Sequence, residues 1–312
     1  MLNHNGKIYQ DKNKLLFSAQ NRAFCYADAL FETIRIIRNI KNNRINYSIP
    51  LWKYHFERLS KGMENFGYDR LESDFLKNEI LKTIFSITPL NTNIKERKND
   101  FKARLTVFRS EGGLYTPIKS SSEFVITLQK IDTLKHFDSD NFDIKKIQKR
   151  YVFFDELPLF PSRFSVFKKV DALPYVLAGK YRKEQKADEV FLLNNENRIA
   201  EAGAANVFIL KNNFSNENKN ENKLHFITPP ASEGGVMGTM RSFLLDNYQN
   251  SNQNNPEIYI EEKSITKTEV NQAEIIFTTN AVQSIQIIKI KTQRQIEIMI
   301  KWINEVNLIF SN

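Results

Sequence analysis

Apolar residues in the first part of the chain follow two different spacings. Across residues 46–67 a helix-like repeat of four is formed by Leu51, His55, Leu59 and Met63. Gly67 follows this repeat and predicts the end of the helix. Helical spacing recurs over 74–85, whereas runs rich in β-branched residues predict strands at 6–10, 30–40, 103–109 and 122–131. The first part of the chain is therefore predicted to be a compact α+β unit.

A polar and then proline-punctuated stretch, residues 131–165, interrupts these patterns, and we place a domain boundary near residue 132. Beyond it the sequence predicts a strand within 147–155, a helix over about 172–186, a hairpin of 189–194 and 199–210 about the turn NENR, and a strand at 274–279. Two Asn-rich tracts, 212–223 and 247–257, have little apolar surface to bury and are predicted to be mobile surface loops. The prediction is a two-domain α+β fold, with a small domain over 1–132 and a larger one over 133–312.

Composition narrows the class of protein. The 312 residues are 41% hydrophobic and 12% aromatic, which excludes a wholly disordered chain. No apolar run approaches the roughly 20 residues of a membrane helix. The start, MLNHNGKIYQ, lacks the apolar core of a secretory signal, and the single Cys25 excludes an intramolecular disulfide framework. We therefore expect a soluble protein of the reducing cytoplasm with no membrane partner.

The net charge of +9 favours an anionic ligand. Because the lysines are dispersed among Asn and Glu rather than gathered in one stripe, a small phosphate-bearing cofactor or carboxylate substrate fits better than a nucleic acid. The chain contains none of the motifs GxxxxGK[ST], GxGxxG, HExxH or GxSxG, and its four His residues lack ligand-like spacing. These absences disfavour common nucleotide-binding enzymes, serine hydrolases and metal hydrolases, and we expect no metal site.

Two charged residues lie in otherwise strand-like surroundings. Lys168 follows an apolar strand-like triplet and precedes a predicted helix. Such a lysine either stays solvated or points into a pocket, where desolvation lowers its pKa and makes the amine a nucleophile for carbonyl groups. Glu201 lies among small residues in RIAEAGAANVFIL, 198–210. It is either an exposed strand acid or a partner for a protonated heterocycle, with Ala and Gly making room for a flat ring.

Two further segments suit a phosphate. His55 and Arg58 are three residues apart and share one helix face, where Arg58 is either a surface residue or a bidentate phosphate ligand. The segment TPPASEGGVMGTMR leads into a helix predicted to start at Gly238 or Thr239, and the N–H groups of a helix N-terminus bind phosphate. An aldehyde for the lysine, a ring nitrogen for the glutamate and a phosphate for these two segments together describe pyridoxal phosphate.

Seven segments, in this order, also carry a family resemblance. They are NRAFCYADALFETIR, HFERL, RLTVFRSEGGLY, FKKVDALPYVLAGK, ADEVFLLNNENRIAEAGAANVFIL, TPPASEGGVMGTMR and EIIFTTNAVQSI. The chain resembles the class IV aminotransferases, the fold type IV pyridoxal-phosphate enzymes that include branched-chain and D-amino-acid aminotransferases and 4-amino-4-deoxychorismate lyase. The resemblance covers nearly the whole chain. It implies a mixed, barrel-like sheet in the larger domain, a pyridoxal 5'-phosphate cofactor and a homodimer.

The resemblance implies roles for particular residues. Lys168 is similar to the lysine that holds the cofactor as a Schiff base, with a spacing to Val176 like that of the D-amino-acid and lyase branches. Glu201 resembles the acid that pairs with the pyridine nitrogen. The implied phosphate-side residues are Arg58, Thr239, Met240, Thr279 and Asn280. The implied substrate-pocket residues are Tyr26, Phe31 and Arg104. Arg104 and Arg109 are five apart in a strand and point to opposite faces, and we expect Arg104 to face the pocket.

Departures from the family pattern bear on the substrate. Ala27 and Ala29 replace usual glycines, Ala281 replaces a frequent phosphate-binding Thr or Ser, and Asp171 and Ala172 replace polar or aromatic residues of some branches. We expect an aminotransferase acting on an amino acid and a 2-oxo acid.

Two alternatives stay open. The first is 4-amino-4-deoxychorismate lyase, which releases pyruvate and 4-aminobenzoate, because AANVF and GTMR resemble AANLF and GIMR of that branch. The second is a protein of another class: a non-catalytic family member that binds a phosphate-bearing ligand, or a basic interaction module.

Overall fold

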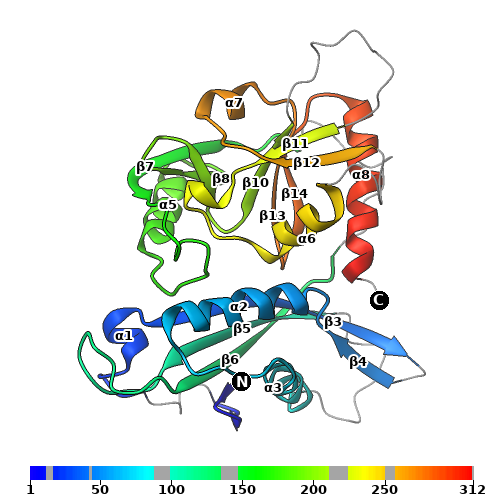
Figure 1. Ribbon diagram of the computed structural model, residues 1–312. Helices are drawn as coiled ribbons and strands as arrows, with labels where there is room; N and C mark the ends of the chain where they lie inside the picture. Colours follow the sequence, from blue (N-terminus) through cyan, green and yellow to red (C-terminus); the bar gives the residue numbers. More distant parts are fainter. Residues whose placement is uncertain are drawn as a thin grey trace. The chain divides into compact units, whose positions relative to one another are not determined.

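The computed structural model describes residues 1–11, 17–41, 44–87, 99–134, 147–210, 224–249 and 257–310. The chain forms two compact units, each with its own helices and sheets (Figure 1). Unit 1 comprises Met1–Lys135, Phe167–Asp171 and Leu308–Asn312, and unit 2 comprises His136–Val166 and Ala172–Asn307. The predicted α+β class is confirmed, and the short segment that contains Lys168 clusters with unit 1.

Unit 1 is built on an antiparallel sheet with the strand order β2-β1-β6-β5-β3-β4. The strands are β1 (Leu2–His4), β2 (Lys7–Tyr9), β3 (Ala29–Lys41), β4 (Arg44–Ser48), β5 (Asp100–Arg109) and β6 (Ser122–Ile131). The four predicted strands of this part of the chain correspond to β2, β3, β5 and β6. In the ladder between β3 and β5, Phe31 is opposite Thr106 and Thr33 is opposite Arg104. This register places the side chains of Phe31 and Arg104 on the same face.

Helices α2 (Trp52–Phe66) and α3 (Ser73–Phe85) confirm the two predicted helices of this unit. Gly67 ends α2 as predicted, because it adopts a left-handed φ of 67° and its N–H reaches back to carbonyls of the last turn. Helix α2 lies close against β3, since a Cβ added to Gly62 would come within 2.8 Å of the Leu30 side chain. This close contact fixes the helix that carries His55 and Arg58.

The two helices cover one face of the sheet. Phe75 of α3 packs edge-on against Phe124, which is opposite Val107 in the β5–β6 ladder. Leu30, beneath α2, is opposite the same Val107 in the β3–β5 ladder. The other face carries helix α1 (Arg22–Tyr26) over a smaller apolar cluster that includes Ala29. A short 3-10 helix, η5 (Leu308–Phe310), completes the unit.

Unit 2 contains two sheets with mixed strand directions. The first has the order β7-β8-β9, and the second has the order β12-β11-β10-β13-β14. Their strands are β7 (Tyr151–Leu159), β8 (Glu189–Asn194), β9 (Ile199–Ala202), β10 (Asn206–Leu210), β11 (Leu224–Thr228), β12 (Ile258–Glu262), β13 (Ile276–Asn280) and β14 (Ser284–Lys289). The pairs β7–β8 and β11–β12 are parallel and the others antiparallel, so the mixed sheet predicted for this part is confirmed.

The segment predicted as one strand over 199–210 is two strands. β9 ends at Ala202 and pairs with β8, whereas β10 begins at Asn206 and pairs with β11 and β13. The residues between them, 203–205, are Gly-Ala-Ala and carry the chain from one sheet to the other. The prediction of one continuous strand was wrong. The apolar pattern of a segment does not indicate where the chain leaves one sheet and pairs with strands of another.

A shared apolar core joins the two sheets of unit 2. Side chains from both sheets, including Phe191, Val207 and Ile276, belong to one buried cluster. The helices are α5 (Leu173–Glu184), α6 (Thr239–Tyr248), α7 (Lys267–Gln272) and α8 (Gln293–Asn307), with a 3-10 turn η4 (Ala231–Glu233). Trp302 of α8 stacks on Phe226 at 5.9 Å between ring centroids. α5 and α6 confirm the predicted helix over 172–186 and the predicted helix start at Gly238 or Thr239.

The Asn-rich tracts have different outcomes. The first, 212–223, lies outside the described residues, as do residues 250–256 of the second. The beginning of the second tract is helical, because α6 continues to Tyr248, which is buried. The expectation of a loop is wrong at residues 247 and 248, because the apolar ring of Tyr248 is buried and holds this end of the tract in the helix.

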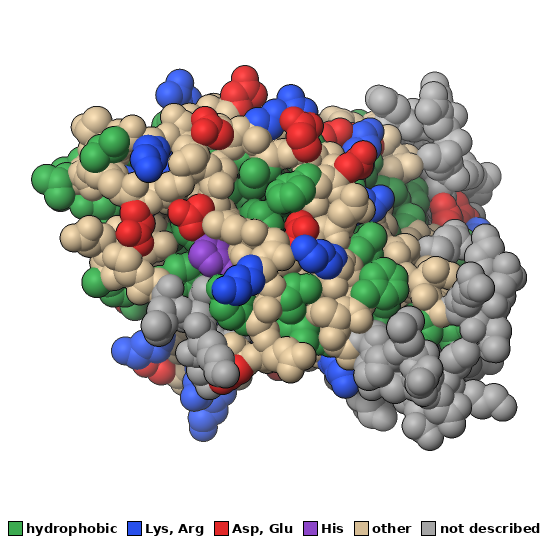
Figure 2. All heavy atoms as spheres, turned by 90° about the horizontal axis from the view of Figure 1, so that it is seen from below, with side chains coloured by type: hydrophobic (Ala, Val, Ile, Leu, Met, Phe, Trp, Pro, Cys, Tyr) green, Lys and Arg blue, Asp and Glu red, His purple; other side chains and the backbone are tan. Residues whose placement is uncertain are grey.

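Charged side chains of both signs are interspersed with apolar ones on the face shown in Figure 2. Lys and Arg are not gathered there into a continuous basic stripe among the coloured residues. In the described ranges, no helix has the length and apolar character needed to cross a membrane.

Candidate active site

Unit 1 holds a buried carboxylate beside two basic side chains of α2. Glu32 accepts hydrogen bonds from Arg58 through Nε, at 2.8 Å, and through a terminal nitrogen, at 2.5 Å. His55, one helical turn before Arg58, places Nδ1 2.6 Å from Glu32 Oε2. The predicted sharing of one helix face by His55 and Arg58 is confirmed. Their partner Glu32 was missed, because sequence spacing does not show which strand residue lies beneath a helix.

The charges of this cluster follow from its environment. Burial disfavours the charged form of Glu32, but the Arg58 charge and the His55 hydrogen bond outweigh burial and lower its pKa from 4.5 to about 2. Burial lowers the pKa of His55, against the hydrogen bond and charge of Glu32. Near neutral pH the carboxylate is therefore ionised and the imidazole neutral, with Nδ1–H donating to Glu32. Arg58 supplies the compensating charge and has its guanidinium plane fixed.

Two cations meet on the ring of Phe31. The Arg104 guanidinium carbon lies 3.6 Å from the ring centroid, and Lys168 Nζ lies 4.7 Å from it. Lys168 is held there by its backbone, because its carbonyl accepts from the Phe31 N–H at 2.9 Å and Lys169 bridges to Leu30. Arg104 is exposed by surface area, and partial desolvation by its neighbours lowers its pKa. Unit 1 thus brings together three predicted site residues: a primary amine, a guanidinium and an aromatic ring.

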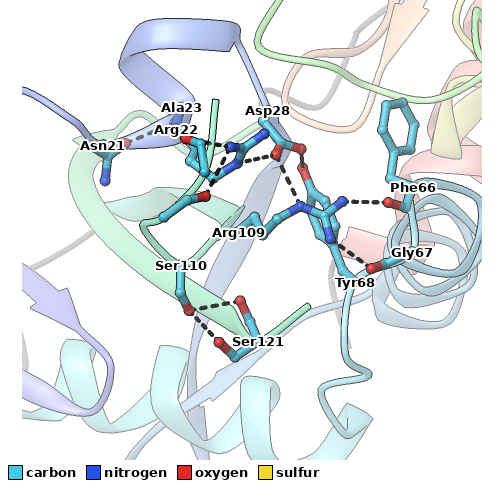
Figure 3. Close-up of polar contacts among 12 residues, drawn as sticks. Asn21, Arg22, Ala23, Asp28, Phe66, Gly67, Tyr68, Arg109, Ser110 and Ser121 are labelled. Carbon is cyan, nitrogen blue, oxygen red and sulfur yellow. Dashed lines mark hydrogen bonds and ion pairs between the residues drawn. The ribbon is translucent and has the colours of Figure 1, made fainter. Parts of the chain in front are cut away.

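Arg109 occupies a different environment, as the five-residue spacing from Arg104 predicted. It donates through Nε to Asp28 at 3.0 Å and through its terminal nitrogens to the carbonyls of Phe66 and Gly67, which end helix α2 (Figure 3). Tyr68 Oη donates to the same aspartate at 2.7 Å. Burial opposes ionisation of Asp28, but its three donors outweigh burial and lower its pKa. Arg109 is therefore a structural cation.

Asp28 also anchors the helix that carries Tyr26. Arg22 of α1 donates through Nε to Asp28 at 2.8 Å and through a terminal nitrogen to the carbonyls of Gly112 and Leu114 (Figure 3). These bonds join α1 to the loop between β5 and β6. In that arrangement the ring of Tyr26 lies 5.6 Å from the ring of Tyr115. The position of Tyr26 is thus set by a buried ionic network that sequence reasoning did not identify.

A cavity of about 600 Å³ opens on the face of the sheet that carries Phe31. Its apolar lining comes from three aromatic rings, of Phe17, Phe24 and Phe108, and from parts of α1, β5 and β6. Thr106, which faces Phe31 in the ladder, is one of its lining residues. The cavity therefore reaches the ladder neighbour of Phe31, on the same face of the sheet.

In unit 2, Glu201 is a buried carboxylate held by neutral donors. The Tyr175 hydroxyl donates to Glu201 Oε1 at 2.5 Å, and the Val236 N–H donates to the same oxygen at 3.0 Å. The side chain of Glu201 points from β9 into the structure, and the residue is 5% exposed. The exposed strand acid considered from sequence is therefore excluded. Tyr175 was missed, because nothing in its position within a predicted helix identifies a partner twenty-six residues away.

The loop before α6 is packed too closely for larger residues. A Cβ on Gly235 would lie 2.6 Å from the Ala200 carbonyl, and a Cβ on Gly238 would lie 1.9 Å from Asn206 Oδ1. Gly238 precedes Thr239 at the start of α6 and provides no side-chain cap. The first N–H groups of this helix, which include those of Thr239 and Met240, therefore need acceptors from elsewhere. Such a helix start is a site for an anion.

An ionic cluster anchors the other end of this loop. Glu233, 1% exposed, accepts hydrogen bonds from Arg198 Nε at 2.8 Å, from Asn194 at 2.5 Å and from Ser264 at 2.5 Å. Gly234 then adopts a left-handed φ of 88° and packs against Pro161. The glycines are thus fixed between Glu233 and helix α6.

Thr279 and Asn280 lie where β13 turns into β14. The Thr279 hydroxyl donates a hydrogen bond to the Ser284 carbonyl, with 2.9 Å between Thr279 Oγ1 and the carbonyl oxygen. Asn280 donates to the Ala204 carbonyl at 3.2 Å and accepts from the N–H groups of Val282 and Gln283. Both side chains hold the turn, and Asn280 ties it to the Gly-Ala-Ala segment that follows Glu201.

The predicted site residues therefore fall into two groups. Unit 1 contains Tyr26, Phe31, Arg58, Arg104 and Lys168, and unit 2 contains Glu201, Thr239, Met240, Thr279 and Asn280. Among the residues that the structure describes, no three His, Cys, Asp or Glu side chains form a group able to hold a metal ion. Within unit 2, an uncapped helix start and a buried carboxylate are groups suited to an organic cofactor.

Comparison with solved structures supports the fold. The branched-chain aminotransferase of Thermoproteus uzoniensis, solved with norvaline, has a TM-score of 0.72 at 18% identity, over 99% of this chain and 94% of that one. The 4-amino-4-deoxychorismate lyase of Pseudomonas aeruginosa has a TM-score of 0.68 at 18% identity, over 96% and 98%. The branched-chain aminotransferase of Thermobaculum terrenum, solved in its PLP form, has a TM-score of 0.70 at 14% identity, over 99% and 94%.

A search of curated proteins gives no match. The family model for amino-transferase class IV matches residues 29–290, which is most of the chain. That range includes both groups of predicted residues apart from Tyr26. The resemblance read from the seven segments is confirmed. The protein belongs to the class IV aminotransferase family and is an enzyme of that family.

Proposed function

We propose that this protein is a pyridoxal-phosphate-dependent aminotransferase that moves an amino group between an amino acid and a 2-oxo acid. The observation that carries this proposal is the meeting of Lys168 and Arg104 on the ring of Phe31. An amine able to react with carbonyl groups and a guanidinium that suits a carboxylate thus both contact one aromatic ring. Amino acids and 2-oxo acids combine those two functional groups. The Thermobaculum terrenum relative, solved in its PLP form, supports the same cofactor class.

The residues of unit 2 fit such a cofactor. Helix α6 starts without a side-chain cap. At Gly235 and Gly238, just before it, an added Cβ would clash with neighbouring atoms. A phosphate would be held by the N–H groups of Thr239 and Met240, together with the turn formed by Thr279 and Asn280. Glu201 is an acceptor suited to a protonated ring nitrogen, because its carboxylate is buried and already oriented by two donors.

The chain's own groups would then share the chemistry. When bound, the cofactor supplies an electron-withdrawing ring that stabilises negative charge developing at the substrate Cα. The Lys168 amine takes the Cα proton and returns it as general base and acid. Glu201 keeps the proton on the ring nitrogen. Arg104 holds the substrate carboxylate, while Phe31 and Tyr26 border the side chain and exclude water.

A lyase activity is the second candidate. Two segments resemble the 4-amino-4-deoxychorismate lyase branch, and these segments touch each other, since Asn206 of AANVF donates to the Val236 carbonyl just before GTMR. The same lysine would then serve a reaction that eliminates pyruvate and yields 4-aminobenzoate.

A substrate panel separates the two reactions. Purified protein loaded with pyridoxal phosphate is incubated either with L- and D-amino acids plus 2-oxoglutarate or with 4-amino-4-deoxychorismate, and the products are quantified. We expect glutamate formation from at least one amino acid, and none with Lys168→Ala. Release of 4-aminobenzoate without any amino transfer would contradict the aminotransferase and establish the lyase. Absence of turnover of either kind would contradict both candidate reactions.

The resemblance also leads us to propose that the enzyme is a cytoplasmic homodimer. Its single cysteine, Cys25, is exposed and unbridged, which suits a reducing compartment. Light scattering on the purified protein should give twice the 36.5 kDa of one chain, and a mass of one chain would reject the dimer.

A further inference from the structure

The hydroxyl of Tyr175 is directed at the carboxylate of Glu201. It donates to Oε1 at 2.5 Å, and the backbone N–H of Val236 donates to the same oxygen at 3.0 Å. Both donors are neutral. They stabilise the ionised form of a carboxylate without adding a positive charge that would compete with a cationic ligand.

The tyrosine ring is fixed by packing. Tyr175 lies in the first turn of α5, where Pro174 restricts the backbone of the helix start. Its ring packs on the buried cluster that contains Phe154 and Ala200, the residue immediately before Glu201. A side chain with an anchored ring and a single polar atom directed at one acceptor is pre-organised to orient that acceptor.

Three elements converge on this carboxylate. β9 supplies Glu201 in register with Leu192 of β8, α5 supplies the hydroxyl, and the glycine loop supplies the Val236 N–H. The loop approaches so closely that a Cβ on Gly235 would be 3.3 Å from Glu201 Cβ. Rotation of the carboxylate would therefore break both hydrogen bonds to Oε1.

We propose that Tyr175 is a positioning residue that fixes Glu201 through Oε1 so that the carboxylate meets the ring nitrogen of the cofactor in one orientation. This inference rests on the proposed function, because it deepens the role given there to Glu201. Tyr175 follows Lys168 by seven residues, so one short segment carries both the reactive amine and the hydroxyl that orients the ring's partner.

Binding of two matched ligands to Tyr175→Phe tests this role. The ligands are pyridoxamine 5'-phosphate, which has no aldehyde to react with Lys168, and an analogue with a C–H in place of the ring nitrogen. We expect calorimetry to show about fivefold weaker binding of pyridoxamine 5'-phosphate, as for the loss of one hydrogen bond, and unchanged binding of the analogue. Tyr181→Phe is the matched control, because Tyr181 lies on the same helix and packs on Phe154.

A double-mutant cycle tests whether Tyr175 acts through Glu201. In a Glu201→Gln background, Tyr175→Phe should no longer discriminate between the two ligands, because the oriented carboxylate is gone. Equal weakening of both ligands by Tyr175→Phe would mean that the hydroxyl only supports packing, and would overturn the inference. Unchanged binding of both ligands would overturn it as well. A wild-type protein that binds neither ligand would instead reject the proposed function.

Discussion

Two buried glutamates, one in each unit, are held by opposite means. Glu32 accepts hydrogen bonds from Arg58 and His55, and the charge of Arg58 helps to lower its pKa to about 2. Glu201 accepts hydrogen bonds from a phenol and a backbone amide. Both are almost fully buried, at 1% and 5% exposure. Burial alone therefore does not distinguish them, and the chemistry of their donors does.

The difference separates two tasks. An acid that is ion-paired to a neighbouring helix fixes that helix, and here it fixes the plane of Arg58. Glu201 interacts electrostatically with Arg241 but accepts hydrogen bonds from two neutral donors, which suits its negative charge to a cationic ligand. We propose that Glu32 is part of the scaffold that orients Arg58, and that Glu201 is the group that would contact the cofactor. Substitutions at the two positions should therefore affect different measurements.

The largest expected effect on stability is that of Glu32→Gln. It removes the buried carboxylate that pairs with the partly buried Arg58 charge, which should cost about 3 kcal/mol of unfolding free energy at pH 7. The free energy is measured by urea denaturation. Glu196→Gln is the control, because Glu196 pairs with Arg198 at the surface and should change stability by less than about 1 kcal/mol. Equal unfolding free energies for Glu32→Gln and Glu196→Gln would contradict the scaffold role of Glu32.

The same residue predicts an acid dependence. The folded-state pKa of Glu32, about 2, is lower than the ordinary value of 4.5 for a glutamate. Its contribution is therefore fully present above about pH 4.5 and is lost as the pH falls towards 2. The stability difference between wild type and Glu32→Gln should shrink over that window by about 3 kcal/mol. A difference that stays constant from pH 5 down to the acid limit of folding would contradict the ion pair.

Arg104→Ala is expected to have a smaller effect than Glu32→Gln, and to change the kinetics of the reaction rather than the stability of the fold. Removal of a charged hydrogen-bond donor for the substrate carboxylate should raise KM for the amino acid about tenfold, with less change in kcat. Lys102→Ala is the matched control, since Lys102 is two residues earlier on β5 and therefore on the same face. If both variants raise KM equally, the effect is one of general positive charge and Arg104 has no specific role.

Local elements were readable from the sequence, and the partners of buried polar groups were not. The period-four pattern and Gly67 predicted α2 and its end, because helix formation and capping depend on neighbours in the chain. The spacing of Arg104 and Arg109 also separated a residue at the Phe31 ring from one in the Asp28 network. These predictions succeeded because strand alternation is a local property.

The missed features all join distant parts of the chain. Tyr175 is twenty-six residues from Glu201, and Arg22 reaches the loop before β6 some ninety residues away. The break of the strand at 203–205 likewise depends on which strands flank β9 and β10. Such partners are chosen by tertiary packing, for which periodicity carries no signal. The sequence identified Glu201 as unusual among small residues, whereas the structure shows how it is held.

We expect Lys168 to react with the carbonyl group of pyridoxal phosphate. Visible absorption of purified protein after cofactor addition and removal of the excess tests it most directly, with Lys168→Ala beside Lys169→Ala. Lys169 is the matched control because it is the adjacent lysine and pairs with Asp171. We expect a protein-bound visible band for the wild type and for Lys169→Ala, and no such band for Lys168→Ala. A colourless wild type, or a Lys168→Ala variant with the wild-type band, would contradict it.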